Sequence, residues 1–181
     1  MTEWYETISG PTLEQGDILL AVRCYRILYS DDGDEVEALE EIHDLVVLTQ
    51  TCDIENGKVA EVVCAKVLSY DSLVVDRGGA FASRGFRTQA GQGAHPSMAL
   101  VPQHEQSGFP WSIADFHSVL TVPLALLGRH AEGQGSRIRL RTPYRESLAQ
   151  GFGVFFMRVG LPVPFRDFED CKPAAVSAAR K

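Results

Sequence analysis

The sequence has no uninterrupted apolar run of about 18 residues, the minimum for a membrane-spanning helix. Its first residues are acidic and polar, and they contain neither the basic nor the apolar segment of a secretory signal. We therefore expect a protein that has no membrane partner and is located in the cytoplasm.

Cysteine is scarce, and the four cysteines form neither a Cys-x-x-Cys pair nor another spacing typical of zinc ligands. Cys24 and Cys64 lie in apolar, strand-like runs, where a free cysteine packs as a small apolar residue. This pattern argues against a disulfide scaffold and favours a reducing compartment. The sequence also lacks a Gly-x-x-x-x-Gly-Lys-Ser/Thr phosphate-binding motif, and it predicts no cofactor.

Acidic side chains are absent from Arg77 to His104, although the chain as a whole has a net charge of −7. Residues 1–76 carry 17 acidic and 4 basic side chains, a net charge of −13. Residues 77–181 carry 7 acidic and 13 basic side chains, a net charge of +6. The halves either compensate each other within the fold or leave a basic face on the second half. The acidic total disfavours indiscriminate binding to nucleic acid.

The most informative stretch runs from Leu45 to Lys66, where two β-branched apolar runs flank a polar segment that ends in Asn56-Gly57. Asn-Gly tolerates positive φ at both central turn positions, so we expect a hairpin that pairs 44–50 with 58–68. A dense polar cluster precedes this turn, and it predicts a site at the strand end. Its members are Thr49, Gln50, Thr51, Cys52 and Asp53.

The flanking segments are less distinctive. Residues 1–15 are expected to be an irregular lead-in, and Ile18 to Tyr29 a strand. Five carboxylates between Asp34 and Glu41 indicate a solvated edge or loop. The glycine-rich residues 77–97 predict a long mobile loop that folds over a ligand.

Beyond that loop, Trp111 to Leu120 is a predicted strand, and Val122 to Leu127 is a predicted short helix that ends at Gly128. The alternation over 136–141 predicts a half-buried strand with three arginines on one face.

A helical stripe of apolar residues predicts a closing helix over 143–159, with Thr142 as its N-cap. The stripe consists of Tyr144, Leu148, Phe152, Phe155, Phe156 and Val159. We expect residues 169–181 to be a flexible tail and residues 1–168 to form one α+β, mainly β domain. Its expected architecture is a small, SH3-like, partly open barrel closed by this helix.

Three segments resemble MazF/PemK-type toxins, which are small SH3-like barrels that usually dimerise and often cleave RNA. They are Gly16–Leu19, Leu45–Thr49 and Val62–Ser69. The resemblance implies a toxin–antitoxin or defence role, with Ser69 at the place of the family's catalytic threonine or serine. The chain departs from the family at His43-Asp44, where the family has an arginine that stabilises charge in phosphoryl transfer. The chain also resembles uncharacterised bacterial proteins with a Ser/Thr-Gln-x-Cys-Asp strand end.

Cys52 and Asp53 are the first candidates for catalysis. A thiol can be a nucleophile when a histidine serves as its base, and the candidates are His43, His95, His104 and His117. Alternatively, Asp53 caps the turn and Cys52 packs beneath it. A zinc site of Cys52, Asp53, His95 and His104 is a further alternative, but the spacing predicts no metal.

Two groups of arginines are candidates for binding anions. The acid-free segment from Arg77 to His104 also contains Arg84, Arg87 and His95, and guanidinium groups and glycine amides both suit phosphate. The alternative is a solvated loop. The second group is a row of four arginines on and after the predicted strand 136–141: Arg137, Arg139, Arg141 and Arg145. This row either binds nucleic-acid backbone or pairs with the acidic edge. The acidic edge consists of Glu35, Glu37, Glu40 and Glu41.

Three functions follow from these residues. The first is a cytoplasmic interaction or ligand-binding module that recognises a protein partner, a second copy or an anionic ligand. Its site would combine the strand-end cluster with residues 77–104. The second is an RNA-cleaving, toxin-like enzyme that uses Cys52, Asp53 and Ser69. The third is a cysteine hydrolase or a zinc-binding protein.

Overall fold

The computed structural model describes residues 4–30 and 36–157. The predicted tail, 169–181, and the end of the predicted closing helix lie outside these residues.

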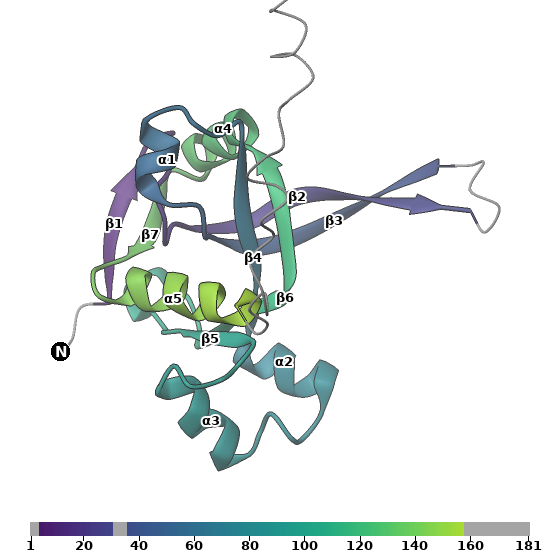
Figure 1. The fold of residues 1–181 in the computed structure, drawn as a ribbon, viewed down its shortest axis with the longest axis vertical. Coiled ribbons are helices and arrows are strands. Elements are labelled where there is room, and N and C mark those ends of the chain that lie inside the picture. Colours follow the sequence, from purple (N-terminus) through teal and green to yellow (C-terminus); the bar gives the residue numbers. More distant parts are fainter. Residues whose placement is uncertain (1–3, 31–35, 158–181) are drawn as a thin grey trace, which may run out of the picture.

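Two antiparallel sheets form the body of the protein (Figure 1). The larger sheet has the strand order β2-β3-β4-β6-β5, and the smaller one pairs β1 with β7. An isolated bridge between Asp17 and Arg139 joins the two sheets. The strands are β1 (Tyr5–Ser9), β2 (Ile18–Tyr29), β3 (Val36–Val47), β4 (Glu61–Ser69), β5 (Met98–Val101), β6 (Ser112–Pro123) and β7 (Ser136–Leu140).

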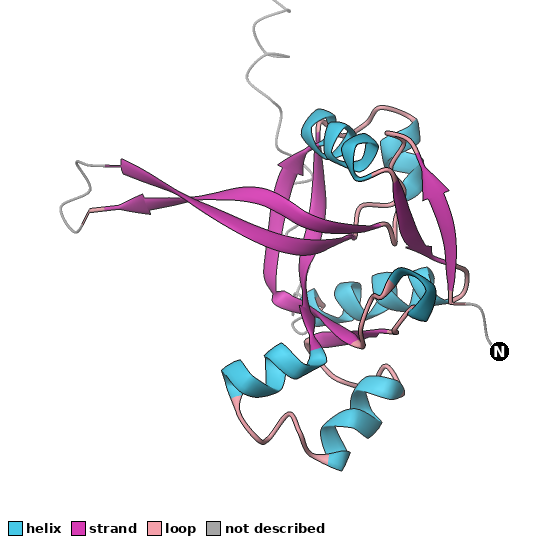
Figure 2. Ribbon diagram, turned by 180° about the vertical axis from the view of Figure 1, so that it is seen from behind, coloured by secondary structure: helices cyan, strands magenta, loops and turns pink. Residues whose placement is uncertain are grey.

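The helices gather at two ends of the body and along one side (Figure 2). The first pair, α1 and α4, lies at one end, α2 and α3 lie at the other, and α5 lies between the two ends. Their bounds are α1 (Thr51–Glu55), α2 (Tyr70–Arg77), α3 (Arg84–Gly91), α4 (Leu124–Gln134) and α5 (Tyr144–Phe156). A short 3-10 helix spans Glu105–Ser107.

Three apolar clusters hold these parts together. One lies between the two sheets and α5, around Ile18, Phe116 and Leu148. A second packs α1 and α4 on the larger sheet. The third joins α2 and α3 to β5 and β6. The predicted α+β, mainly β class is confirmed, and the arrangement is consistent with a small, partly open barrel.

The predicted tight turn at Asn56-Gly57 is wrong in its details. Asp44–Val47 of β3 does pair with Cys64–Val67 of β4, but α1 lies between the strands. Gly57, with φ at 62°, follows this helix rather than forming the centre of a two-residue turn. The five-residue helix contributes Ile54 to the core, and this tertiary packing is what the local sequence did not reveal.

The predicted long loop over 77–97 is also wrong, because it contains α3. The Ser83 hydroxyl caps this helix by accepting a hydrogen bond from the Phe86 amide at 3.1 Å. Phe86 and Ala90 bury one helix face. The two glycines within 84–91 weaken the helical pattern of the sequence, because each glycine disfavours helix formation by about 1 kcal/mol relative to alanine.

Three further expectations need correction. The lead-in 1–15 contains β1, which pairs with the distant β7 and therefore has no local signal. The described part of the acidic edge, residues 36–41, is the expected solvated edge, mostly exposed and paired only with β2, but it is regular strand within β3, so the loop alternative is wrong. The helix expected over 122–127 begins only at Leu124 and continues past Gly128 to Gln134.

The closing helix is present, with two differences from the prediction. Its N-cap is Pro143 rather than Thr142, and no side chain supplies a capping hydrogen bond. Leu148 is buried, and Phe152 and Phe155 pack on the core, but Phe156 is 63% exposed. No helix within the described residues is long and apolar enough to span a bilayer.

Candidate functional site

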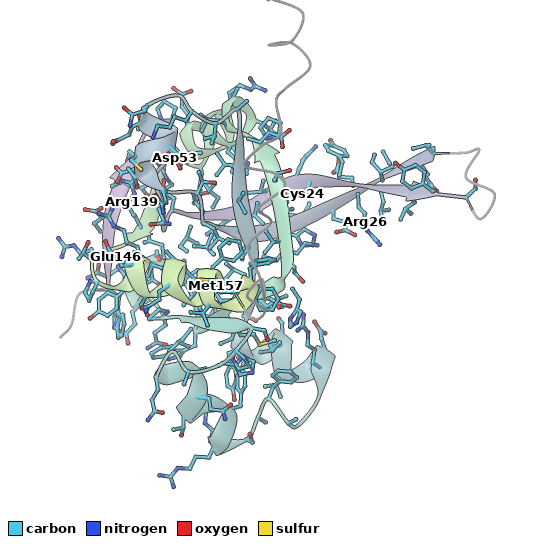
Figure 3. The ribbon with its side chains drawn as sticks, viewed as in Figure 1. Cys24, Arg26, Asp53, Arg139, Glu146 and Met157 are labelled. Atoms are coloured by element: carbon cyan, nitrogen blue, oxygen red, sulfur yellow. The ribbon has the colours of Figure 1, made fainter. Side chains whose placement is uncertain are left out.

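The polar strand-end cluster lies on and just before α1. Asp53 accepts a hydrogen bond from Lys58 Nζ at 3.1 Å, and Cys52 is exposed beside it. Thr49 has a structural role, because its hydroxyl accepts a hydrogen bond from the Val63 amide at 2.7 Å. Gln50 is exposed, and Figure 3 shows Asp53 at the end of the molecule away from α2 and α3.

Ser69 does not join this cluster. It lies at the last position of β4, whereas α1 precedes the first. Eight residue steps of about 3.3 Å separate the two ends of this nine-residue strand by roughly 26 Å. Its hydroxyl caps α2 by accepting from the Ser72 amide at 3.1 Å. The structure therefore does not bring Cys52, Asp53 and Ser69 into one site.

The described residues contain no group of three histidine, cysteine or acidic side chains placed to hold a metal ion. His95 contacts the Phe86 ring on α3, and His104 lies against Tyr5, with its Nδ1 2.9 Å from the Ser107 hydroxyl. The geometry therefore does not assemble the zinc set, and it gives Cys52 no histidine base.

The second row of arginines is mostly internal. Arg137 and Arg139 are buried and share the carboxylate of Asp17, which is fully buried. Arg139 also pairs with Glu14, and so does Arg145. Internal pairing is thus confirmed for Arg137 and Arg139, but their partners are Asp17 and Glu14 rather than the acidic edge. Because these two guanidinium groups are buried and paired, they are not available to nucleic-acid backbone.

A small aromatic pocket lies between α2, α3, β5 and the start of β6. It measures about 270 Å³ and is lined by Tyr70, Phe86, Arg87, Ala90, Leu100, Trp111 and Ile113. The rings of Tyr70 and Phe86 lie parallel, at an interplanar angle of 5° with centroids 6.2 Å apart. Trp111, at the rim, is 43% exposed.

Hydrogen bonds fix the walls of this aromatic pocket. The Tyr70 hydroxyl donates to the Phe81 carbonyl at 2.8 Å. The Tyr70 amide donates to the Trp111 carbonyl, also at 2.8 Å. The Phe81 ring meets the Phe86 ring edge to face. The pocket is therefore preorganised rather than formed by ligand.

Arginines flank the aromatic pocket. Arg87 lines it, and Arg84 is exposed one helical turn earlier, on the same side of α3. The only carboxylates between residues 70 and 98 are Asp71 and Asp76, both exposed on α2. The rim of the pocket on α3 is thus positively charged.

A buried carboxylate lies at the far end of α2. Asp115 on β6 is fully buried and accepts a hydrogen bond from Arg77 Nη2 at 2.5 Å. It also accepts from the His117 amide at 3.0 Å and from the Ser118 hydroxyl at 3.3 Å. The His117 ring is 60% exposed, and its Nδ1 lies 3.4 Å from Asp115 Oδ1. Nε2 is thus on the ring side away from the carboxylate.

The electrostatics around Asp115 follow from this geometry. Burial by itself would raise the pKa of Asp115, but the hydrogen bonds and charge of Arg77 and its neighbours lower that pKa below its usual value. The pKa of His95 is lowered by burial, although Asp115 opposes this. At neutral pH, then, Asp115 is ionised and His95 is uncharged.

The comparisons with known proteins add no relative: no protein-family model matches the sequence, and no curated protein matches it. The resemblance to MazF/PemK-type toxins therefore stays a prediction.

Sequence reasoning missed Asp115 and the aromatic pocket. Tyr70, Phe86 and Trp111 come from segments that meet only in the folded chain, so no spacing in the sequence links them. Asp115 did have a signal, since it is a carboxylate between Ile113 and Phe116 in the middle of a predicted strand, and an unpaired charge buried with these apolar residues would be costly.

Proposed function

We propose that this protein binds an anionic ligand that carries a flat, unsaturated ring, of the kind found in a nucleotide or in single-stranded RNA. The ring would enter the aromatic pocket, and its phosphate would meet Arg87 and Arg84. The observation that carries the proposal is the contact of one preformed aromatic pocket with an arginine-bearing helix face.

The size of the pocket supports a small ring system. Pockets for drug-sized ligands measure roughly 300–1,000 Å³, and this one, at about 270 Å³, is slightly smaller. Stacking on aromatic side chains tolerates any base and contributes about 1–3 kcal/mol per base. Arginine adds a planar fork that suits phosphate oxygens.

The test is a titration of a fluorescently labelled single-stranded oligoribonucleotide, followed by anisotropy. We expect Trp111→Ala to weaken binding by about 5–150-fold, which is the stacking free energy expressed as a ratio. Arg87→Gln should also weaken binding. The slope of log affinity against log salt concentration should fall by about 1, which is the contribution of one phosphate contact.

The matched control is Arg129→Gln, which removes an exposed arginine from α4 at the other end of the molecule. It should leave affinity unchanged. Equal loss in the Arg87 and Arg129 variants would mean that only net charge matters, and this would refute the pocket. Mononucleotides and inorganic phosphate as competitors separate recognition of the ring from recognition of the phosphate.

A second candidate function is RNA cleavage, and the contacts of Asp115 with Arg77 and His117 favour it. Asp115 would hold the His117 ring so that Nε2 accepts the proton of a ribose 2′-hydroxyl. The 2′-oxygen would attack the phosphorus, and the departing 5′-oxygen would take a proton from water. Arg77, 36% exposed, would neutralise the phosphate charge. The products are a 2′,3′-cyclic phosphate and a 5′-hydroxyl end.

This second candidate is tested separately from binding. Wild-type protein should cleave the same oligoribonucleotide to cyclic-phosphate ends, and His117→Gln should lose about 100-fold or more in rate while keeping its affinity. Absence of cleavage at enzyme excess, with binding intact, would leave a binding module and exclude the enzyme.

A further inference from the structure

The two longest strands of the first half of the chain extend beyond the body as an arm, which we define as residues 22–29 of β2 and 36–43 of β3. Figure 1 shows the arm reaching away from the other strands. β3 pairs with β4 only from Asp44 onward, and β2 is the edge of the sheet. Within the described residues the arm is therefore a two-stranded ribbon, an arrangement that is only marginally stable in water by itself.

One face of this arm is apolar. Residues that pair across an antiparallel ribbon lie on the same face, and four such pairs make up what we call the outer face: Arg23–Ile42, Tyr25–Glu40, Ile27–Ala38 and Tyr29–Val36. Its large apolar side chains are well exposed: Tyr25 61%, Ile27 48%, Tyr29 70%, Val36 62% and Ile42 60%.

The opposite face is more polar, although it includes Leu28 and an exposed Leu39, and it is joined to the body at its base. Glu41 lies 2.7 Å from His43 Nε2 and accepts hydrogen bonds from Lys66 on β4 and from Arg26. These contacts lower the pKa of Glu41 to about 2. Figure 3 shows Arg26 and Cys24, both from this face, along the arm. The body therefore holds the opposite face of the arm at its base and leaves most of the outer face exposed.

The exposed area is large enough for an interface. At roughly 200 Å² for a whole tyrosine side chain, the outer face exposes on the order of 500 Å² of apolar surface. Two such faces in contact would bury on the order of 1,000 Å², the lower bound for a specific interface.

The charges of the outer face suit a second copy of itself. Its two charged residues, Arg23 and Glu40, have opposite signs and lie 3.9 Å apart. The face is therefore neutral, although the first half of the chain is strongly acidic. A neutral apolar face does not require a charged partner, and two copies of it meet without repulsion between like charges.

We propose that the outer face of the arm binds the same face of a second copy of this chain and forms a two-fold symmetric dimer. With the axis running across the strands between the Tyr25–Glu40 and Ile27–Ala38 pairs, Arg23 of each copy lies over Tyr29 of the other. This contact occurs twice, as two-fold symmetry requires, and places a guanidinium over an aromatic ring. The dimer is independent of the ligand proposed for the aromatic pocket.

The first test is sedimentation equilibrium of the whole chain. Wild-type protein should form a dimer, with a dissociation constant in the micromolar range that is typical of weak, transient interfaces. Ile27→Glu should raise that constant by about 100-fold or more, because it buries two unpaired charges. Val75→Glu is the control, since Val75 on α2 is 82% exposed outside the arm, and it should remain a dimer.

A second test fixes the geometry of the dimer. In a Cys52→Ser background, a protein with Arg23→Cys is mixed with one carrying Tyr29→Cys under mild oxidation. We expect disulfide-linked mixed dimers to exceed those formed by either protein alone. A wild-type protein that stays monomeric, or an Ile27→Glu protein that dimerises normally, would overturn the proposal and leave the arm to a different partner.

Discussion

At the scale of single residues, the buried carboxylates organise the molecule. Asp17 is shared by Arg137 and Arg139, which also donate to the carbonyls of Gly10 and Thr12. Asp115 is shared by Arg77, His117 and Ser118. The described residues contain no buried side-chain nitrogen or oxygen without a hydrogen-bond partner, so removing either carboxylate leaves polar groups unsatisfied.

Asp17→Asn should therefore destabilise the protein by about 3–5 kcal/mol, because it leaves buried guanidinium charge without compensation. Asp76→Asn, at an exposed carboxylate of α2, should change stability by no more than about 0.5 kcal/mol. Urea unfolding followed by circular dichroism measures both. If Asp17→Asn unfolds like the Asp76 control, the buried network is not what joins the two sheets.

Asp115 has a testable pH dependence. Because its pKa in the folded protein is lowered, the stability it contributes is present above the unfolded value of about 3.9 and is lost as pH falls through the folded pKa. Asp115→Asn should be less stable than wild type by about 1–3 kcal/mol at pH 7. The difference in unfolding free energy between Asp115→Asn and wild type should become smaller below about pH 4. A gap that stays constant across this range would contradict the assigned ionisation.

At the scale of elements, the junction between the two sheets depends on Gly16. Its φ is +87°, and a Cβ there would lie 3.1 Å from the Cβ atoms of both Arg145 and Leu140. Gly78 has nearly the same φ, +89°, with nothing within 4 Å of the added carbon. Both glycines are in a conformation that other residues rarely adopt, but only Gly16 is also crowded.

Alanine substitutions at Gly16 and Gly78 separate the cost of backbone strain from the cost of crowding. Gly78→Ala should cost about 1 kcal/mol through its positive φ alone. Gly16→Ala should cost more, about 2–4 kcal/mol, because the neighbouring strand must also shift. Thermal unfolding of the two variants in parallel gives the comparison. Equal losses of stability in the two variants would show that β7 and α5 can move away from the added Cβ of residue 16 at no cost.

The same scale shows how far the sequence could predict the fold. Ile18–Tyr29 is predicted as a strand with its observed bounds, since a long run rich in aliphatic and aromatic residues carries a local signal. β1 was missed because its partner, β7, lies more than a hundred residues away. The burial of Arg137 and Arg139 was missed for the same reason: alternation locates a strand but does not reveal which residue faces a distant carboxylate.

The candidate site was predictable only in part. Arg77, Arg84 and Arg87 were selected from an acid-free segment, and Arg84 and Arg87 do lie on one exposed helix. Their proximity to Tyr70 and Trp111 arises from the packing of α2 and α3 on β5 and β6. The sequence pattern groups Cys52 and Asp53 with these arginines, but α1, which carries both residues, lies at the end of the body opposite α2 and α3 (Figure 1).

At the scale of the whole molecule, three regions are spatially separate. The arm presents an apolar face, α1 presents the polar cluster with Cys52, and α2 with α3 presents the aromatic pocket and its arginines (Figure 1). This separation means that dimerisation through the arm and ligand binding at the pocket can be abolished independently. The Ile27→Glu protein should bind the oligoribonucleotide with wild-type affinity for each chain.

The most direct test of the ligand proposal is an amide NMR titration of the uniformly ¹⁵N-labelled protein with a nucleoside monophosphate. The account predicts that shifts concentrate on α2, on α3 and at the Trp111 indole N–H, and that Trp111→Ala moves the titration of α2 and α3 to about 5–150-fold higher nucleotide concentration. Shifts centred on Thr49 to Asp53 would contradict the assignment of the aromatic pocket as the binding site. So would the absence of shifts at the highest nucleotide concentration of the titration.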